Sequence, residues 1–304
     1  MHEGSQRAVV AAFLANLGIA FAKFAAFLAT GAASMLAESV HSLADTGNQA
    51  LLLLGARRAR REPSREHPFG YGRERYFWAF VVALLLFSLG AIFAIAEGVE
   101  KLRHPHELGS LRWAFAVLFA AIALESVSLR TAVREANAVR GQEGWWAFVR
   151  RAKSPELPVV LLEDIGALLG LVFALAGVAL AVATGDPRFD ALGSVAIGLL
   201  LGAIAALLAS EMKSLLIGEA ASPSVEARMR AAIESAPSVR RLIHMRTLHL
   251  GPDELLLGAK LEFAGDLDVP ALARAIDVVE ARVRAEVPET RVIFVEPDVM
   301  RSGA

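Results

Sequence analysis

The sequence contains no cysteine, and this absence removes several kinds of chemistry at once. Without cysteine, the chain has no disulfide, no thiolate metal site and no cysteine nucleophile. An excess of charge is also missing, because 31 basic residues are set against 32 acidic ones. We therefore expect no nucleic-acid partner, since such partners need a basic surface. No HExxH motif is present, which argues against a metallohydrolase of that type.

Long apolar runs are what the chain does have. Its residues are 55% hydrophobic and its mean hydropathy is +0.49, both high for a soluble protein. Each run is close to the roughly 20 residues that a membrane-spanning helix needs. The first run follows a head with one arginine and has no convincing cleavage site, so we expect a retained helix and not a signal peptide. The six runs cover residues 8–29, 33–56, 77–99, 110–130, 157–183 and 189–210.

The character of the chain changes after residue 212. Residues 223–235 and 269–287 have helical spacing, and residues 240–250, 254–264 and 290–296 have the pattern of strands. The first two strands are separated by Gly251, Pro252 and Asp253, which predict a turn. We therefore predict a six-helix membrane domain over residues 1–212. We predict that residues 213–304 form a small α+β domain with the ferredoxin-like order αββαβ.

Basic residues predict the orientation in the membrane. The connection after the second run is rich in arginine from Arg57 to Arg75, and the connection after the fourth is basic from Arg134 to Lys153. The other connections are poorer in basic residues. Since short basic loops stay in the cytoplasm, we expect both termini and the C-terminal domain to be cytoplasmic.

Polar residues interrupt the second apolar run at helical spacing. His41 and Asp45 are four residues apart and so share one face of a helix. Glu38 and Asn48 fall near the same stripe. An ionisable side chain inside a bilayer costs roughly 2.5 to 3.5 kcal/mol on insertion scales, so such residues usually mark a functional site. The fifth run carries a second interruption, the acidic pair Glu163–Asp164.

This combination of residue types is typical of a metal site. A neutral imidazole with carboxylates suits zinc, and also manganese, iron(II) or cobalt(II). Such ligands must lose protons to bind metal, which provides a simple basis for exchanging metal against protons. The alternative is that these side chains only form hydrogen bonds between helices. Two separate polar interruptions in two spanning segments favour the metal site.

Four sequence strings resemble the cation diffusion facilitator family. They are AESVHSLADTGNQ, EHPFGYGRERYFWAF, KSPELPVVLLEDIGALLGLVFALAG and DPRFDALGSVAIGLLLG, in the family's order and spacing. The strings SPELPVVLLED and HPFGYGRERYFW are most similar to the zinc transporter 9-like branch. The resemblance implies six helices, a homodimer, a four-ligand metal site between the second and fifth helices, and proton-coupled export of a divalent metal.

The ligand set carries over only in part. By this resemblance His41 and Asp45 match the two ligands of the second helix, and Asp164 matches the second ligand of the fifth. The first ligand of the fifth helix falls on Val160, which cannot bind metal. Glu163 is our first choice for the fourth ligand. It lies about 100° around the axis from Asp164, so it can share an ion with Asp164 only if the helix is locally distorted. The other candidates are Glu38, Asn48 and water, and Glu163 could instead pair with Lys23 or an arginine.

The leading hypothesis is a proton-coupled antiporter for a divalent cation, and not an enzyme. Zinc is the first expectation, with manganese, iron(II), cobalt or cadmium as alternatives. We expect a multi-pass protein of the bilayer, in the inner membrane of a bacterium, whose C-terminal domain serves mainly as a dimer contact. Two other hypotheses stay open: a membrane metal sensor that does not transport, and an intramembrane metalloenzyme.

Overall fold

The computed structural model describes residues 33–105 and 111–300, together with residues 10, 13, 14, 16–18, 20–22, 24, 25 and 28. For some of these residues the structure describes the backbone but not the side chain: residues 33–42, 44, 86, 87, 113 and 114. The chain divides into two compact units. One contains residues 1–58 and 75–213, and the other contains residues 59–74 and 214–304.

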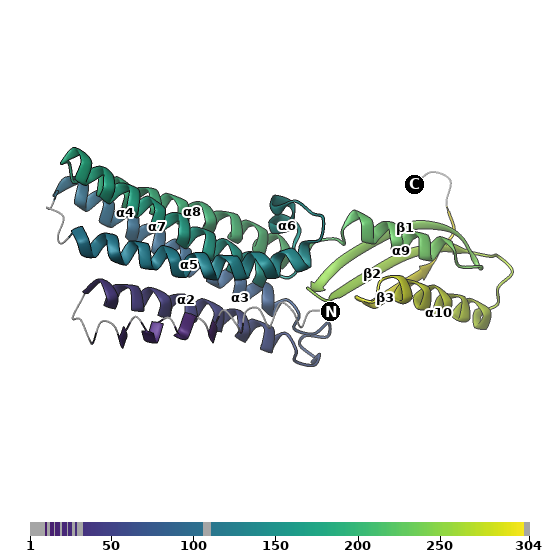
Figure 1. Ribbon diagram of the computed structural model, residues 1–304. Helices are drawn as coiled ribbons and strands as arrows, with labels where there is room; N and C mark the ends of the chain where they lie inside the picture. Colours follow the sequence, from purple (N-terminus) through teal and green to yellow (C-terminus); the bar gives the residue numbers. More distant parts are fainter. Residues whose placement is uncertain are drawn as a thin grey trace. The chain divides into compact units, whose positions relative to one another are not determined.

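The first unit is helical (Figure 1). Among the described residues, four helical segments are long and apolar enough to cross a membrane: Glu74–Arg103, Phe115–Arg140, Glu156–Thr184 and Arg188–Ile217. They confirm the third to sixth apolar runs. The second run forms α2 (Ala33–Arg58), whose apolar residues are interrupted by polar ones, and the first run lies largely outside the description. Six spans therefore stay a prediction.

The third span is continuous but not uniform. It begins as α3 (Glu74–Val82), passes through a π-helical turn, η1 (Ala83–Phe87), and continues as α4 (Ser88–Arg103). A π-helical turn carries one extra residue per turn and often occurs near functional sites. Three further helices follow: α5 (Leu111–Arg140), the short α6 (Trp145–Arg151) and α7 (Glu156–Thr184). The last helix of this unit is α8 (Arg188–Ile217).

Glycines allow α8 to approach its neighbours closely. A Cβ atom added at Gly198 would lie 2.8 Å from the carbonyl oxygen of Ala91 in α4. An added Cβ at Gly177 of α7 would lie 2.9 Å from the carbonyl oxygen of Phe189 in α8. Such distances are too short for a side chain, so these positions hold the helix backbones in direct contact. Figure 1 shows α4, α7 and α8 running alongside one another.

A buried ion pair joins α3 to α7. The Arg75 guanidinium donates to both carboxylate oxygens of Glu156, with distances of 2.5 and 2.8 Å. The two side chains are only 6% and 3% exposed. Glu156 lies in the first turn of α7, where the helix dipole also favours a negative charge. This bidentate contact fixes the beginnings of two spanning segments against each other.

The C-terminal part of the second unit has the predicted order, α9 (Pro223–Glu234), β1 (Val239–Gly251), β2 (Glu254–Phe263), α10 (Val269–Glu286) and β3 (Thr290–Pro297). Ser222 and Asp268 cap the two helices by accepting hydrogen bonds from backbone N–H groups. The sheet has the order β1-β2-β3, antiparallel between β1 and β2 and parallel between β2 and β3. Alternate residues of β2, from Leu255 to Leu261, enter a core with Ile233 and Val279. The predicted small α+β domain is confirmed.

The segment between α2 and α3 packs within this second unit. A Cβ atom added at Gly72 would lie 2.8 Å from the carbonyl oxygen of Leu250, so the two backbones are in contact. The side chain of Arg73 donates to the carbonyl oxygen of Leu216 over 3.4 Å. Residues 59–74 therefore belong structurally with a sheet that is distant in sequence.

Candidate metal-transport site

Two of the predicted residues meet between α2 and α7. The Asn48 side-chain amide donates to Glu163 Oε1 over 2.7 Å. Both residues are buried. The helix α7 continues without a break through this position, so Glu163 reaches α2 without the local distortion that the sequence argument required. The partner shown for Glu163 is Asn48; Lys23, the other suggested partner, lies outside the described residues.

Asp164 points to a different neighbour. Its Oδ2 accepts a hydrogen bond from the Ser128 hydroxyl of α5 over 3.1 Å, and the residue is 4% exposed. Neighbouring residues on a helix are separated by about 100° around its axis, so one acidic pair can face two helices. α7 therefore presents Glu163 toward α2 and Asp164 toward α5.

Asp45 and Glu125 belong to the same acidic cluster. Asp45 of α2 is half-buried and interacts electrostatically with both Glu163 and Asp164. Glu125 of α5 interacts with the same two carboxylates. Sequence reasoning did not assign Glu125 or Ser128 to the site. Their spacing of three residues, which places them on one face of α5, was the available signal.

Three buried oxygens of α2 and α7 have no hydrogen-bond partner within the described part of the chain. They are Asn48 Oδ1, Gln49 Oε1 and Glu163 Oε2. An acceptor that is buried without a donor is costly, and native proteins rarely keep one without reason. Carboxylate and amide oxygens of this kind are suitable ligands for a divalent cation.

The remaining predicted residues divide into two groups. His41 and Glu38 belong to α2, but their side chains are outside the described ones. Val160 is buried in α7, one turn before Asp164. Among the residues whose side chains are described, no three histidine, cysteine, aspartate or glutamate side chains converge closely enough to hold a metal ion. The side chains described at the site are oxygen-bearing groups on α2, α5 and α7.

Spanning helices with carboxylates buried between them define a class, the polytopic membrane proteins that carry ionisable groups along an ion pathway. The sequence model of the cation efflux transmembrane domain matches residues 9–217. The chain therefore belongs to the cation efflux, or cation diffusion facilitator, family, a family of transporters and not of enzymes. This confirms the resemblance of the four sequence strings.

Relatives carry related names. The chain is 35% identical over 265 residues to the proton-coupled zinc antiporter SLC30A9, mitochondrial, of Xenopus laevis, covering 86% of this chain and 47% of the relative. It is 31% identical over 267 residues to metal tolerance protein C4 of Arabidopsis thaliana, covering 87% and 58%. It is 25% identical over 253 residues to zinc transporter ZitB of Escherichia coli strain K12, covering 82% and 75%. The chain thus spans about half the length of the animal relative.

Solved structures match the C-terminal region. A structure of MamM-CTD is 21% identical, with a TM-score of 0.24, and the match covers 25% of this chain and 96% of that one. The transmembrane domain of the family covers residues 9–217 of the chain.

Proposed function

We propose that this protein is a proton-coupled antiporter that moves a divalent metal ion, with zinc as its main substrate, through a site between α2 and α7. The observation that carries the proposal is the contact between Asn48 and Glu163, where a buried carboxylate oxygen and a buried amide oxygen have no partner among the described groups. A cation between the helices would satisfy both oxygens. Asp45, Asp164 and His41 are the other proposed ligands, with Glu38 as a further candidate on α2.

Glu163 is the proposed replacement for the ligand missing at Val160. It lies three residues further along α7 and already faces α2 through Asn48. A site with one histidine and several oxygens is harder than a site with two histidines, so it would also accept manganese, iron(II), cobalt or cadmium. Zinc is favoured because the mitochondrial and bacterial relatives are named as zinc transporters.

Proton coupling follows from the same groups. Carboxylates and imidazole bind metal only when deprotonated, so metal release lets protons bind in its place. A cluster of buried carboxylates is costly to leave both charged and empty, which favours this exchange. Alternating exposure of the site to the two sides would complete the cycle. We further propose a homodimer, with both termini and the C-terminal domain in the cytoplasm, in the inner membrane of a bacterium.

The test uses the full chain in proteoliposomes that contain a zinc indicator and a pH indicator. Asp45→Asn and Asp164→Asn are expected to reduce zinc-driven proton flux at least about tenfold, because each removes a ligand charge but keeps the side-chain shape. Glu163→Gln should weaken zinc binding in the same assay. Glu143→Gln is the matched control, since this exposed residue lies in the α5–α6 connection and only its backbone contacts Arg140.

Three outcomes separate the hypotheses. Undiminished flux in Asp45→Asn or Asp164→Asn would contradict the site. Zinc binding without flux in the unaltered protein would identify a sensor and not a transporter. Unchanged zinc affinity in Glu163→Gln would remove Glu163 from the ligand set while leaving the transport proposal in place.

A further inference from the structure

The connection between α5 and α7 carries an unusual surface. It contains the short helix α6, whose sequence WWAFVRR combines two tryptophans with two arginines. Phe148 and Val149 are buried and fix α6 to its unit. Trp145 and Trp146 are 40% and 63% exposed. A surface tryptophan in a soluble protein exposes a large apolar area to water, so exposed indoles at this place require an explanation.

Each of the two tryptophans is paired with a guanidinium group. The Arg140 guanidinium carbon lies 4.2 Å from the ring centre of Trp145, and that of Arg150 lies 5.8 Å from the ring centre of Trp146. Both distances are within the range of a cation–π contact. Arg150 is also held by Glu211 of α8, with 3.0 Å between Nε and Oε1. The aromatic and basic groups are therefore ordered together and do not extend independently into solvent.

The position of α6 in the chain identifies its surroundings. It lies between two spanning segments, one ending at Arg140 and the next beginning at Glu156, so the connection lies at a membrane surface. Residues 140–155 contain Arg140, Arg150, Arg151 and Lys153 but a single acidic residue, Glu143. Indole rings favour the headgroup level of a bilayer, where their apolar body and N–H group are both satisfied. Guanidinium groups bind phosphate through two parallel hydrogen bonds.

We propose that α6 and the end of α5 form a binding surface for anionic phospholipid headgroups. The indoles of Trp145 and Trp146 lie among the headgroups, and the arginines bind the phosphates. The net positive charge selects anionic over zwitterionic lipid, and each basic side chain at such a surface contributes about a fivefold preference. This surface does not depend on the proposed transport activity.

The test places a single tryptophan in the full-length protein. In the variant Trp78→Phe/Trp113→Phe/Trp145→Phe, the one remaining indole is Trp146. The protein is reconstituted into vesicles of phosphatidylcholine and phosphatidylglycerol, in which one lipid at a time is brominated near the headgroup end of its acyl chain. Quenching of the indole by each brominated lipid gives their relative binding constant at α6. If this variant does not fold, the companion that retains Trp145 in place of Trp146 is measured.

The expected result is strong quenching, with phosphatidylglycerol bound about fivefold or more in preference to phosphatidylcholine. In the Arg150→Gln/Arg151→Gln background this preference should fall about fivefold or more, because only Arg140 and Lys153 remain, while quenching persists. Glu211→Gln is the matched control, because it breaks the ion pair with Arg150 but keeps both arginines, and it should retain the preference. An indole that neither lipid quenches would overturn the proposal. Equal quenching by both lipids with the arginines present would also overturn it.

Discussion

The ion pair between Arg75 and Glu156 gives a prediction whose size follows from its burial. Glu156→Gln leaves the guanidinium charge of Arg75 in place, with side chains that are 6% and 3% exposed in the native pair. Breaking a buried pair by removing one partner typically costs about 3–5 kcal/mol, because the other charge stays buried without compensation. We expect a loss in this range for the helical unit.

A double-mutant cycle separates the ion pair from the packing of the two side chains. Arg75→Leu and Glu156→Leu should each be strongly destabilising, and the double variant should lose much less than their sum, since no charge is left buried. Glu211→Gln is the control for a less buried pair, because its partner Arg150 is 56% exposed, although Glu211 itself is 12% exposed. Its expected cost is about 0.2–1 kcal/mol.

The assay is unfolding of the full chain in mixed micelles with increasing sodium dodecyl sulfate, followed by far-ultraviolet ellipticity and extrapolated to zero denaturing detergent. The reasoning about burial would be refuted if Glu156→Gln cost no more than Glu211→Gln. It would also be refuted if the losses of the two leucine variants were simply additive.

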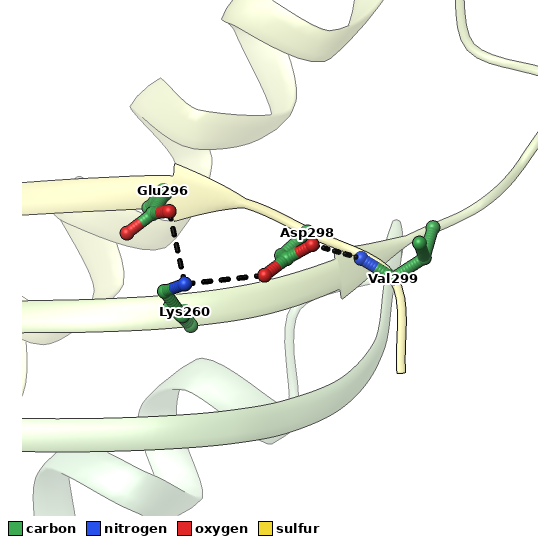
Figure 2. Close-up of polar contacts among 4 residues, drawn as sticks. All are labelled: Lys260, Glu296, Asp298 and Val299. Carbon is green, nitrogen blue, oxygen red and sulfur yellow. Dashed lines mark hydrogen bonds and ion pairs between the residues drawn. The ribbon is translucent and has the colours of Figure 1, made fainter. Parts of the chain in front are cut away.

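Two further predictions test helix packing and charge. Gly198→Ala should lose about 1–3 kcal/mol in the same unfolding assay, because its Cβ would lie 2.8 Å from the carbonyl oxygen of Ala91. Gly202→Ala, with its nearest contact at 3.8 Å, should be neutral or slightly stabilising, and equal losses would contradict this packing. Figure 2 shows Lys260 between Glu296 and Asp298, whose hydrogen bonds and charges raise the pKa of Lys260 above the ordinary value of 10.5. The charged form of Lys260 therefore stabilises the folded protein through these two contacts. This contribution to stability is complete below the ordinary lysine pKa and is lost as pH rises through the raised value. Nuclear magnetic resonance of ¹³C-methylated lysines should show a lower Lys260 pKa in Glu296→Gln, and an unchanged pKa would remove Glu296 as the main cause.

Periodicity and turn residues predicted the C-terminal domain almost residue by residue. The predicted strand over 254–264 ends one residue later than the observed β2, and the predicted helix over 269–287 ends one residue later than α10. This accuracy has local causes: Pro223 is the first residue of α9, Pro270 is the second residue of α10, and Pro252 and Asp253 form the turn between β1 and β2.

Hydropathy located the four spanning helices found among the described residues, but not their ends. The fourth apolar run stops at residue 130, whereas α5 continues to Arg140, because a helix can continue through polar residues where an apolar run ends. The π-helical turn η1 and the short helix α6 were not predicted. Neither has a distinct hydrophobic period, and a segment as short as α6 depends on the packing of Phe148 and Val149.

The candidate site shows what spacing alone omits. Asp45, Asn48, Glu163 and Asp164 were identified because polar residues in apolar runs are conspicuous. Which of them meet depends on the rotation of each helix against its neighbours, so the contact of Glu163 with α2 and of Asp164 with Ser128 needed the structure. The side chain of His41 lies outside the described residues, and its place in the site stays a prediction.

The placement of residues 59–74 with the C-terminal sheet makes that unit discontinuous in sequence. The backbone therefore passes from one unit to the other three times, after Arg58, after Glu74 and after Lys213. A protein shortened at Lys213 would keep residues 59–74 but lose Leu216 and Leu250, the groups that they contact. Deleting the C-terminal domain would thus alter the link between α2 and α3 as well, and point substitutions within β1 are the cleaner way to separate the roles of the two units.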